Sequence, residues 1–504
     1  MQSRTTYSIK NLLSTIIPYF IIGILGFIKI RVFVDNLSED IVSLNQLFFQ
    51  LLGYLSLAEA GFGVFIIQKY YKAFAEKKYE KINEIFSTSL VYFKALGIFL
   101  MGASVALSFF IPFLTKVSVS NNYIQIVFLV FMAKNAVEYF MMTPRFVMQA
   151  DQKMYKINLL ISAIRIIESS VEIILVLAGF NYLVILIPGF FIKILLNIII
   201  NKIVYKEYRW LRSDGKFRKK EIKGMGDLIT QKIAGVLYTN TDVILVSAFI
   251  GPTAVVMYTS YTYITKFIFD VIFTGSQAFA PSLANVMNND ENSKRYAVFN
   301  ELNMVFYFMA ALFATVLYLT LSPLISLWVG EKYVISTVGL ILFLSIMFID
   351  ISRRMIYQII NIEGIFKETK KIIVLEAIAN LILSLIFIKY FGVVGALLGT
   401  LVSILITTFW YIPNYIYKNI FSIKKSEYFK EFIIAAGIPI LIAYILKKLQ
   451  LITIIDVKSL ITSGILNTTI TVLILFITYY LCFPAFKRLV EKGIFYLKNN
   501  RKRK

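Results

Sequence analysis

Long apolar stretches alternate with short polar connections along the whole chain. A helix needs about 20 residues to cross the hydrocarbon core of a bilayer, and fourteen apolar stretches come close to or exceed that length. They are continuous rather than alternating in polarity, which favours helices over the strands of a membrane barrel. The predicted spans are residues 12–34, 41–68, 87–114, 122–143, 157–179, 182–204, 226–250, 253–284, 298–322, 336–358, 371–389, 394–417, 431–449 and 459–483. The pattern therefore predicts an all-α polytopic membrane protein with about 14 transmembrane helices.

The basic residues of the connections predict the orientation of these helices. Lys and Arg are enriched in cytoplasmic loops of membrane proteins. With the N-terminus in the cytoplasm, most of the 52 Lys and Arg residues fall in the cytoplasmic segments. The connections on the other side hold only Lys116, Lys332, Lys389, Lys447, Lys448 and Lys458. This asymmetry favours an even number of spans, with both termini cytoplasmic, in a cytoplasmic (inner) membrane.

Composition narrows the possible functions further. The chain is 58% hydrophobic and 16% charged, with a net charge of +23. Such a charge can indicate nucleic-acid binding, but here the basic residues lie in short connections between apolar runs, so we expect no nucleic-acid partner. His is absent and Cys occurs once, which excludes Ser-His-Asp catalysis, His-based zinc sites and disulfides. No G-x-x-x-x-G-K-[ST] segment is present. We therefore expect no enzyme, no catalytic residues, no metal site and no ATP-driven step.

The most basic internal connection divides the chain into two halves. A segment beginning at Tyr79 (YEKINEI) is weakly similar to one beginning at Tyr296 (YAVFNEL), and six predicted helices separate them. An even number of helices gives the two copies the same orientation, which is typical of parallel repeats in transporters, although chance similarity between apolar helices stays open. The predicted organisation is an N-terminal six-helix lobe at 1–204, a basic cytoplasmic inter-lobe loop at 205–225, a C-terminal six-helix lobe at 226–417, accessory helices 13 and 14 at 431–483, and a basic cytoplasmic tail at 484–504.

Several charged residues lie inside the predicted spans. A charge at the bilayer centre costs about 2.5–3.5 kcal/mol on insertion scales, so such residues usually face a cavity or a partner. The candidate substrate-binding cations are Lys134, Arg165, Lys193, Lys266, Arg31 and Lys29. The candidate coupling-ion or charge-partner residues are Glu138, Glu168, Glu172, Asp242 and Asp270.

The chemistry of these residues allows two interpretations. A cation in a low-dielectric cavity attracts a phosphate or a sugar acid strongly. The carboxylates could bind a coupling H⁺ or Na⁺, and no other cofactor is expected. The spacing predicts that Arg165, Glu168 and Glu172 share one helix face. The alternative is that Lys134–Glu138 and Lys266–Asp270 are structural ion pairs. In the same alternative, Arg31 and Lys29 of the first span extend to the membrane interface.

Three segments resemble one family of membrane transporters. They are LNQLFFQLLGYLSLAEAGFG (Leu44–Gly63), QAFAPSLANV (Gln277–Val286) and LISLWVGEKY (Leu324–Tyr333). They are similar to segments of bacterial polysaccharide repeat-unit flippases of the Wzx type, within the superfamily of multidrug, oligosaccharidyl-lipid and polysaccharide exporters. The resemblance implies two six-helix lobes around a central cavity that alternates in access. It also implies a cargo of sugar repeat units on undecaprenyl pyrophosphate for surface polysaccharide biosynthesis.

The resemblance also implies binding partners, and it leaves alternative functions open. The expected partners are the lipid-linked oligosaccharide, membrane lipids, and a polysaccharide polymerase with its chain-length regulator, while the accessory helices would flank a groove for the lipid tail. A cation-coupled exporter of drugs or metabolites would have fewer buried cations and a dominant acidic site. A lipid II flippase is a near neighbour that the sequence leaves open. A membrane glycosyltransferase or polymerase is less favoured, because the outer connections are too short for a catalytic loop.

Overall fold

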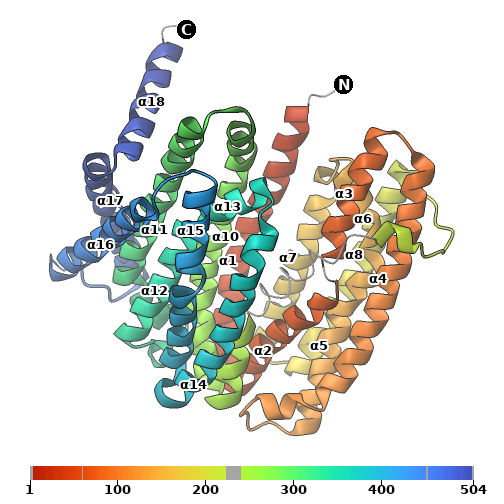
Figure 1. The fold of residues 1–504 in the computed structure, drawn as a ribbon. Helices are drawn as coiled ribbons and strands as arrows, with labels where there is room; N and C mark the ends of the chain where they lie inside the picture. Colours follow the sequence, from red (N-terminus) through yellow and green to blue (C-terminus); the bar gives the residue numbers. More distant parts are fainter. Residues whose placement is uncertain (1–3, 60, 223–239, 450–451, 502–504) are drawn as a thin grey trace. The chain divides into compact units, whose positions relative to one another are not determined.

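The computed structural model describes residues 4–59, 61–222, 240–449 and 452–501. Helices dominate these residues, and no strand occurs among them (Figure 1). The chain divides into two compact units, Met1–Val256 and Met257–Lys504. Each unit is described by itself below.

The first unit is a helical bundle in which long helices pack side by side. Its helices are α1 (Arg4–Asn36), α2 (Glu39–Leu55), η1 (Ser56–Glu59), α3 (Phe62–Ala75), α4 (Tyr79–Ser108), η2 (Ile111–Leu114), α5 (Asn121–Met141), α6 (Thr143–Ala150), α7 (Tyr155–Leu177), α8 (Tyr182–Glu207), η3 (Lys219–Ile222) and the helix Asn240–Phe249. Helix α7 packs against α1 and α8, and α5 packs against α4 and α8. Helices α1, α7, α8 and α5 therefore follow one another as packed neighbours in this unit.

The predicted span 41–68 is broken into two helices. Helix α2 ends at Leu55, a short 3₁₀ turn follows, and α3 begins after Gly61. Gly61 has φ 73°, a left-handed backbone conformation that glycine adopts without the steric cost of a side chain. The continuous apolar run gave no sign of this break, which lies next to Gly61.

The basic segment after α8 lies along the start of α4. The side chain of Asn83 donates to the carbonyl of Trp210 at 3.2 Å and accepts from the N–H of Arg212 at 2.9 Å. One turn further along α4, Ser87 Oγ accepts from the N–H of Asp214 at 3.0 Å. These side chains satisfy backbone groups that no helix or sheet would otherwise pair. This segment, residues 208–222, is thus held in place along α4, and we call it the strap.

Ion pairs complete the attachment of this strap. Glu221 is buried and binds Lys81 at 2.6 Å and Lys69 at 3.7 Å. The Arg218 guanidinium, hydrogen-bonded to Asp214, holds the pKa of that carboxyl well below its usual value. The basic residues here are therefore partly neutralised by acids of the strap and of α4.

The second unit is arranged around α11. Its helices are α10 (Pro252–Asn289, whose first residues belong to the first unit), α11 (Asn292–Trp328), η4 (Glu331–Tyr333), α12 (Thr337–Ser352), α13 (Arg354–Glu363), α14 (Phe366–Ile406), α15 (Thr408–Asn419), α16 (Lys425–Leu449), α17 (Val457–Cys482) and α18 (Pro484–Arg501). Helices α12, α16, α17 and α18 all pack against α11. The basic end of the chain is tied to α11 by Lys492, which binds both oxygens of buried Glu301 at 2.7 and 2.8 Å.

Helix α14 is a hairpin of two helical arms. Its backbone leaves helical geometry at Gly392, with φ 57°. Asn380 of the first arm donates to Thr400 of the second at 2.9 Å. A Cβ added to Gly399 would lie 2.4 Å from Ser384 Oγ, so the arms approach closely where small residues face each other. The predicted spans 371–389 and 394–417 correspond to the first arm and to the second arm with α15.

Asparagines at the start of α4 and of α11 hold later parts of the chain in their own unit. In the second unit, Asn292 at the start of α11 donates to the carbonyl of Phe421 at 2.7 Å, and Asn300 donates to Glu431 at 2.9 Å. The start of α4 holds the strap after α8 in the same way. The internal repeat itself stays a prediction.

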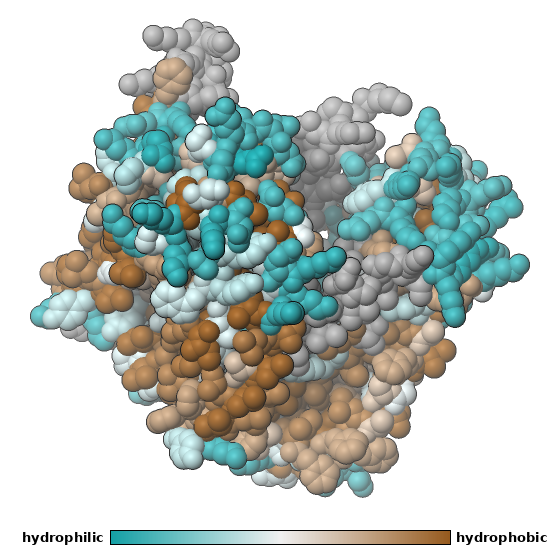
Figure 2. Space-filling view, in the orientation of Figure 1, coloured by the Kyte–Doolittle hydropathy of each residue, from teal (hydrophilic) through white to brown (hydrophobic). Residues whose placement is uncertain are grey.

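Apolar helices of membrane-spanning length are present in both units. Among the described residues, nine helices are long and apolar enough to cross a membrane, one of them the 54-residue stretch Phe366–Asn419 that contains the hairpin. Figure 2 shows broad areas of apolar side chains on both units, separate from areas where hydrophilic residues gather. Most of the predicted span 226–250 lies outside the described residues, so the count of about 14 stays a prediction. The chain is a multi-pass membrane protein.

Candidate functional site

Buried charges of the first unit form a network across four helices. Glu172 of α7 accepts from Lys29 of α1 and, at 2.8 Å, from Lys134 of α5. Lys134 also binds Glu168 at 2.8 Å. Lys193 of α8 lies 3.7 Å from the other oxygen of Glu168. We call Lys29, Lys134, Lys193, Glu168 and Glu172 the lysine–glutamate cluster.

Three of the five cluster residues are buried, and the cluster carries excess positive charge. Lys134, Lys193 and Glu172 are 3%, 7% and 2% exposed. Three ammonium groups face two carboxylates, so the cluster has a formal charge of +1. A buried charge is stable only when a partner compensates for its lost hydration. The unbalanced cation therefore attracts an anion more strongly than a surface lysine does.

Local sequence places these side chains together. Glu168 and Glu172 are one turn apart on α7, so both can reach Lys134 of α5 from the same helix face. Gly189, one turn before Lys193 on α8, leaves room for the lysine of α5. A Cβ added to this glycine would lie 2.7 Å from Lys134 Cδ and 3.1 Å from Glu168 Oε1. The glycine is thus part of the site, although its role is visible only in three dimensions.

A second polar group extends the cluster along α8. Arg145 of the short helix α6 binds Glu138 at 3.3 Å and donates to Asn197 of α8. Asn197 donates to the carbonyl of Lys193 at 2.7 Å. Sequence reasoning missed Arg145 and Asn197, since the arginine was counted in a cytoplasmic connection. The dipeptide Thr143–Pro144, which starts a new helix after an apolar run, was the available signal.

The partners of Lys134 differ from the expected ones. The one-turn pair Lys134–Glu138 does not form in the described part of the chain, because the carboxylates of α7 are closer to the lysine than Glu138 is. Glu138 binds Arg145 instead. Lys193 has the longest ion pair of the cluster and is also held by the side-chain oxygen of Asn135 at 2.8 Å. It is the least tightly neutralised lysine of the three.

Arg165 lies at the exposed edge of the same helix face. It precedes Glu172 by seven residues, two turns and about 10 Å along α7. The side chain is exposed, and within the described residues it has no ion pair. Its expected sharing of a face with Glu168 and Glu172 is thus geometrically right, but only the two acids are covered by neighbouring helices. Arg165 is accessible to a ligand next to a buried positive cluster.

The remaining predicted residues lie elsewhere. Arg31 forms a 2.6 Å ion pair with Asp35 one turn along α1 and does not join the cluster. Asp242 is buried on the helix Asn240–Phe249 of the first unit. Lys266 of the second unit is exposed, and in the described chain it forms no ion pair, with Asp270 or with any other acid. The roles of these residues in binding stay predictions.

The second unit has a different buried polar centre. It lies where α12 is followed directly by α13 and α14 is followed directly by α15. Arg353, between α12 and α13, donates to Thr408 at 2.8 Å and to Asp350 at 3.1 Å. Glu376 of α14 accepts from Thr408 and, at 3.4 Å, from Thr407, the residue between α14 and α15. We call these five residues the arginine junction. Sequence reasoning placed Arg353 in a cytoplasmic connection and did not select Glu376.

No family model matches this sequence, and neither does any curated protein. Solved structures, however, share its fold. A lipid II flippase, MurJ, in an inward closed conformation has a TM-score of 0.70 at 16% identity, over 94% of this chain and 99% of that chain. An inward-facing multidrug resistance MATE family transporter of the MOP superfamily has a TM-score of 0.63 at 13% identity, over 79% of this chain and 97% of that chain.

A third structure agrees with these two. The Vibrio cholerae MATE transporter VcmN has a TM-score of 0.56 at 14% identity, over 80% of this chain and 94% of that chain. Identities this low describe the fold alone. The chain therefore has the two-lobed, all-helical fold that the lipid II flippase MurJ and the MATE transporters share.

Proposed function

We propose that this protein is a flippase that moves undecaprenyl-pyrophosphate-linked oligosaccharide repeat units across the bacterial cytoplasmic membrane for surface polysaccharide biosynthesis. It works by alternating access and catalyses no covalent reaction. The observation that carries the proposal is the lysine–glutamate cluster, with its excess positive charge inside a flippase-like fold. A pyrophosphate is the part of this cargo that such a cluster would recognise.

The cluster and Arg165 offer two successive contacts for the pyrophosphate. Arg165 is exposed and has no ion pair in the described chain, so it meets the anion first. Lys193 then turns toward the anion, because its 3.7 Å pair with Glu168 is the weakest of the cluster. Glu168 and Glu172 hold the other lysines in place throughout. Binding thereby requires little rearrangement of buried charge.

The geometry of Glu168 and Glu172 argues against the cation-coupled exporter as the first choice. The MATE structures favour that rival at the level of fold. A coupling H⁺ or Na⁺ would need a carboxylate that is free to take it up. Each oxygen of Glu168 and Glu172 already faces an ammonium group. In our proposal these acids are charge partners, and the cargo anion is the ligand.

A lipid II flippase is the second candidate. It is favoured by the MurJ structure, which covers a larger share of this chain than the MATE structures do. Both cargoes present a lipid-linked phosphate to the same cluster, so the sugar portion distinguishes them. In either case we place both termini in the cytoplasm, and a polysaccharide polymerase with its chain-length regulator would receive the repeat units on the outer side.

Deletion of the gene tests the proposal. Undecaprenyl-linked repeat units should accumulate in the cytoplasmic leaflet, and surface polysaccharide should be lost. The wild-type gene should restore export, whereas a Lys193→Gln gene expressed at the same level should not. Unchanged surface polysaccharide with increased drug sensitivity would support the exporter instead. Accumulation of lipid II with cell lysis would support the second candidate.

A further inference from the structure

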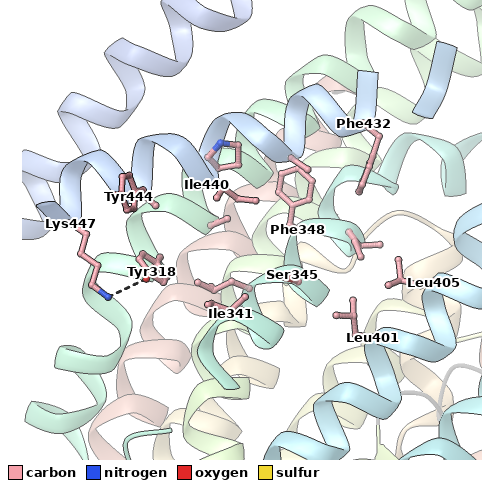
Figure 3. A pocket seen from close by; sticks show the side chains of 16 residues that line it. Tyr318, Ile341, Ser345, Phe348, Leu401, Leu405, Phe432, Ile440, Tyr444 and Lys447 are labelled. Atoms are coloured by element: carbon pink, nitrogen blue, oxygen red, sulfur yellow. Dashed lines mark hydrogen bonds between the residues drawn. The ribbon is translucent and has the colours of Figure 1, made fainter. Parts of the chain in front are cut away.

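The second unit contains an apolar groove along α16, the first of the two accessory helices. Helices α11, α12, α14 and α16 form its walls around a cavity of about 500 Å³. Figure 3 shows Lys447 and Tyr318 at one end of the groove, with Phe432 and Leu405 toward the other. Its volume lies within the range of ligand sites. The groove is therefore large enough to hold a lipid chain.

The groove has a closed floor and an open side. Phe348 and Ile349 of α12 are buried at its base. At its rim, Ile440 and Ile341 are 71% and 46% exposed. Along α16 the lining spans 16 residues from Phe432 to Lys447, a helical length of about 22 Å. Since the hydrocarbon core of one bilayer is about 30 Å thick, the groove suits an extended acyl chain more than a compact ligand.

One end of the groove carries an uncompensated cation. Lys447 Nζ donates to the hydroxyl of Tyr318 at 3.2 Å and lies 5.0 Å from the centre of that ring. No carboxylate binds Lys447 in the described chain. An ammonium group has three donors, and this contact uses one of them. The remaining donors are available to a phosphate at the end of an apolar slot.

We propose that this groove binds one acyl chain of an anionic phospholipid of the surrounding bilayer, whose phosphate is held by Lys447 and Tyr318. Charge complementarity and the length of the slot select this occupant. In the orientation proposed above, Lys447 lies at the outer end of α16, whereas the cargo is loaded from the cytoplasmic leaflet. The occupant is therefore a resident lipid of the outer leaflet, and its binding holds whether or not the proposed cargo is correct.

Native mass spectrometry of the purified full-length protein tests the site. The probe is dioleoylphosphatidylglycerol, titrated into the protein in detergent, with dioleoylphosphatidylcholine as the uncharged reference. Wild-type protein should retain one phosphatidylglycerol more tightly than phosphatidylcholine. Lys447→Gln should weaken that binding about tenfold, because it removes a charge-assisted hydrogen bond. The matched control is Lys458→Gln, which removes an exposed lysine from the start of α17, outside the groove, and should change nothing.

A second variant separates the apolar slot from the charge. Ala443 lines the groove and is buried, so Ala443→Phe should fill the slot and remove tight phosphatidylglycerol binding while Lys447 remains. Equal melting temperatures would show that both variants are folded. If Lys447→Gln and wild-type protein bound phosphatidylglycerol equally, the site would be refuted. Displacement of phosphatidylglycerol by an equimolar amount of undecaprenyl phosphate would also overturn it, since the groove would then hold the cargo's tail.

Discussion

The two units of this protein handle buried charge in different ways. In the first, three lysines and two glutamates pair across the continuous helices α1, α5, α7 and α8. In the second, Arg353 lies where helices are interrupted and satisfies a hydroxyl and a carboxylate there. The first arrangement leaves positive charge in excess, whereas the second supports local backbone geometry. Only the first is suited to attract an anionic cargo.

The largest expected effect comes from breaking the balance of the lysine–glutamate cluster. Glu172→Gln leaves Lys29 and Lys134 facing a neutral amide, and losing one member of a buried ion pair costs about 3–5 kcal/mol. We expect low expression and a strongly reduced melting temperature in detergent. Glu80→Gln, an exposed change at the start of α4, is the control. A melting temperature equal to that of the control would show that the cluster is not a structural centre.

The arginine junction should affect stability without affecting transport. Arg353→Met removes hydrogen bonds to Thr408 and Asp350, and we expect a loss of about 2–3 kcal/mol in stability. Transport per folded molecule should stay close to wild type. Flipping measured in proteoliposomes, normalised to folded protein, checks this. A complete loss of flipping by folded protein would place the second unit's centre in the transport path and remove the contrast between the units.

Arg165 should affect transport without affecting stability, the reverse of the arginine junction. Arg165→Gln removes an exposed cation, so stability should change by less than about 0.5 kcal/mol. Flipping should fall about tenfold, because one charge-assisted contact is worth roughly 1.5 kcal/mol or more. Arg31→Gln, in which the lost cation is paired with Asp35, is the matched control and should flip normally. Equal flipping by the two variants would contradict the role of Arg165.

The smallest effect concerns the room that a glycine makes for the cluster. In Gly189→Ala the new Cβ would lie 2.7 Å from Lys134 Cδ, which a flexible lysine chain can relieve by shifting. We expect a loss of about 1 kcal/mol. Gly395→Ala is the comparison in the hairpin of the second unit, where the Cβ would lie 2.1 Å from the backbone oxygen of Phe387. If the hairpin variant were as stable as Gly189→Ala, the close packing of its two arms would be in doubt.

The helices of this protein could be predicted from the sequence more readily than the contacts between its side chains. The length of an apolar run is a local property, so the spans could be predicted, including the two arms that meet at Gly392. The ion pairs of Lys134 could not, because its acids come from another helix and displace the expected partner Glu138. Arg145 and Arg353 were missed for a related reason. A charge next to a helix end looks like part of a loop until neighbouring helices are seen to cover it.

The central claim is that the excess positive charge of the lysine–glutamate cluster binds the cargo's pyrophosphate. Lys193→Gln tests it most directly, because this change leaves two lysines against two glutamates and therefore a balanced, stable cluster. The measurement is the affinity of the purified protein for undecaprenyl pyrophosphate. We predict an affinity about tenfold lower than that of wild-type protein, at an unchanged melting temperature. Equal affinity in wild-type and Lys193→Gln protein would contradict the account.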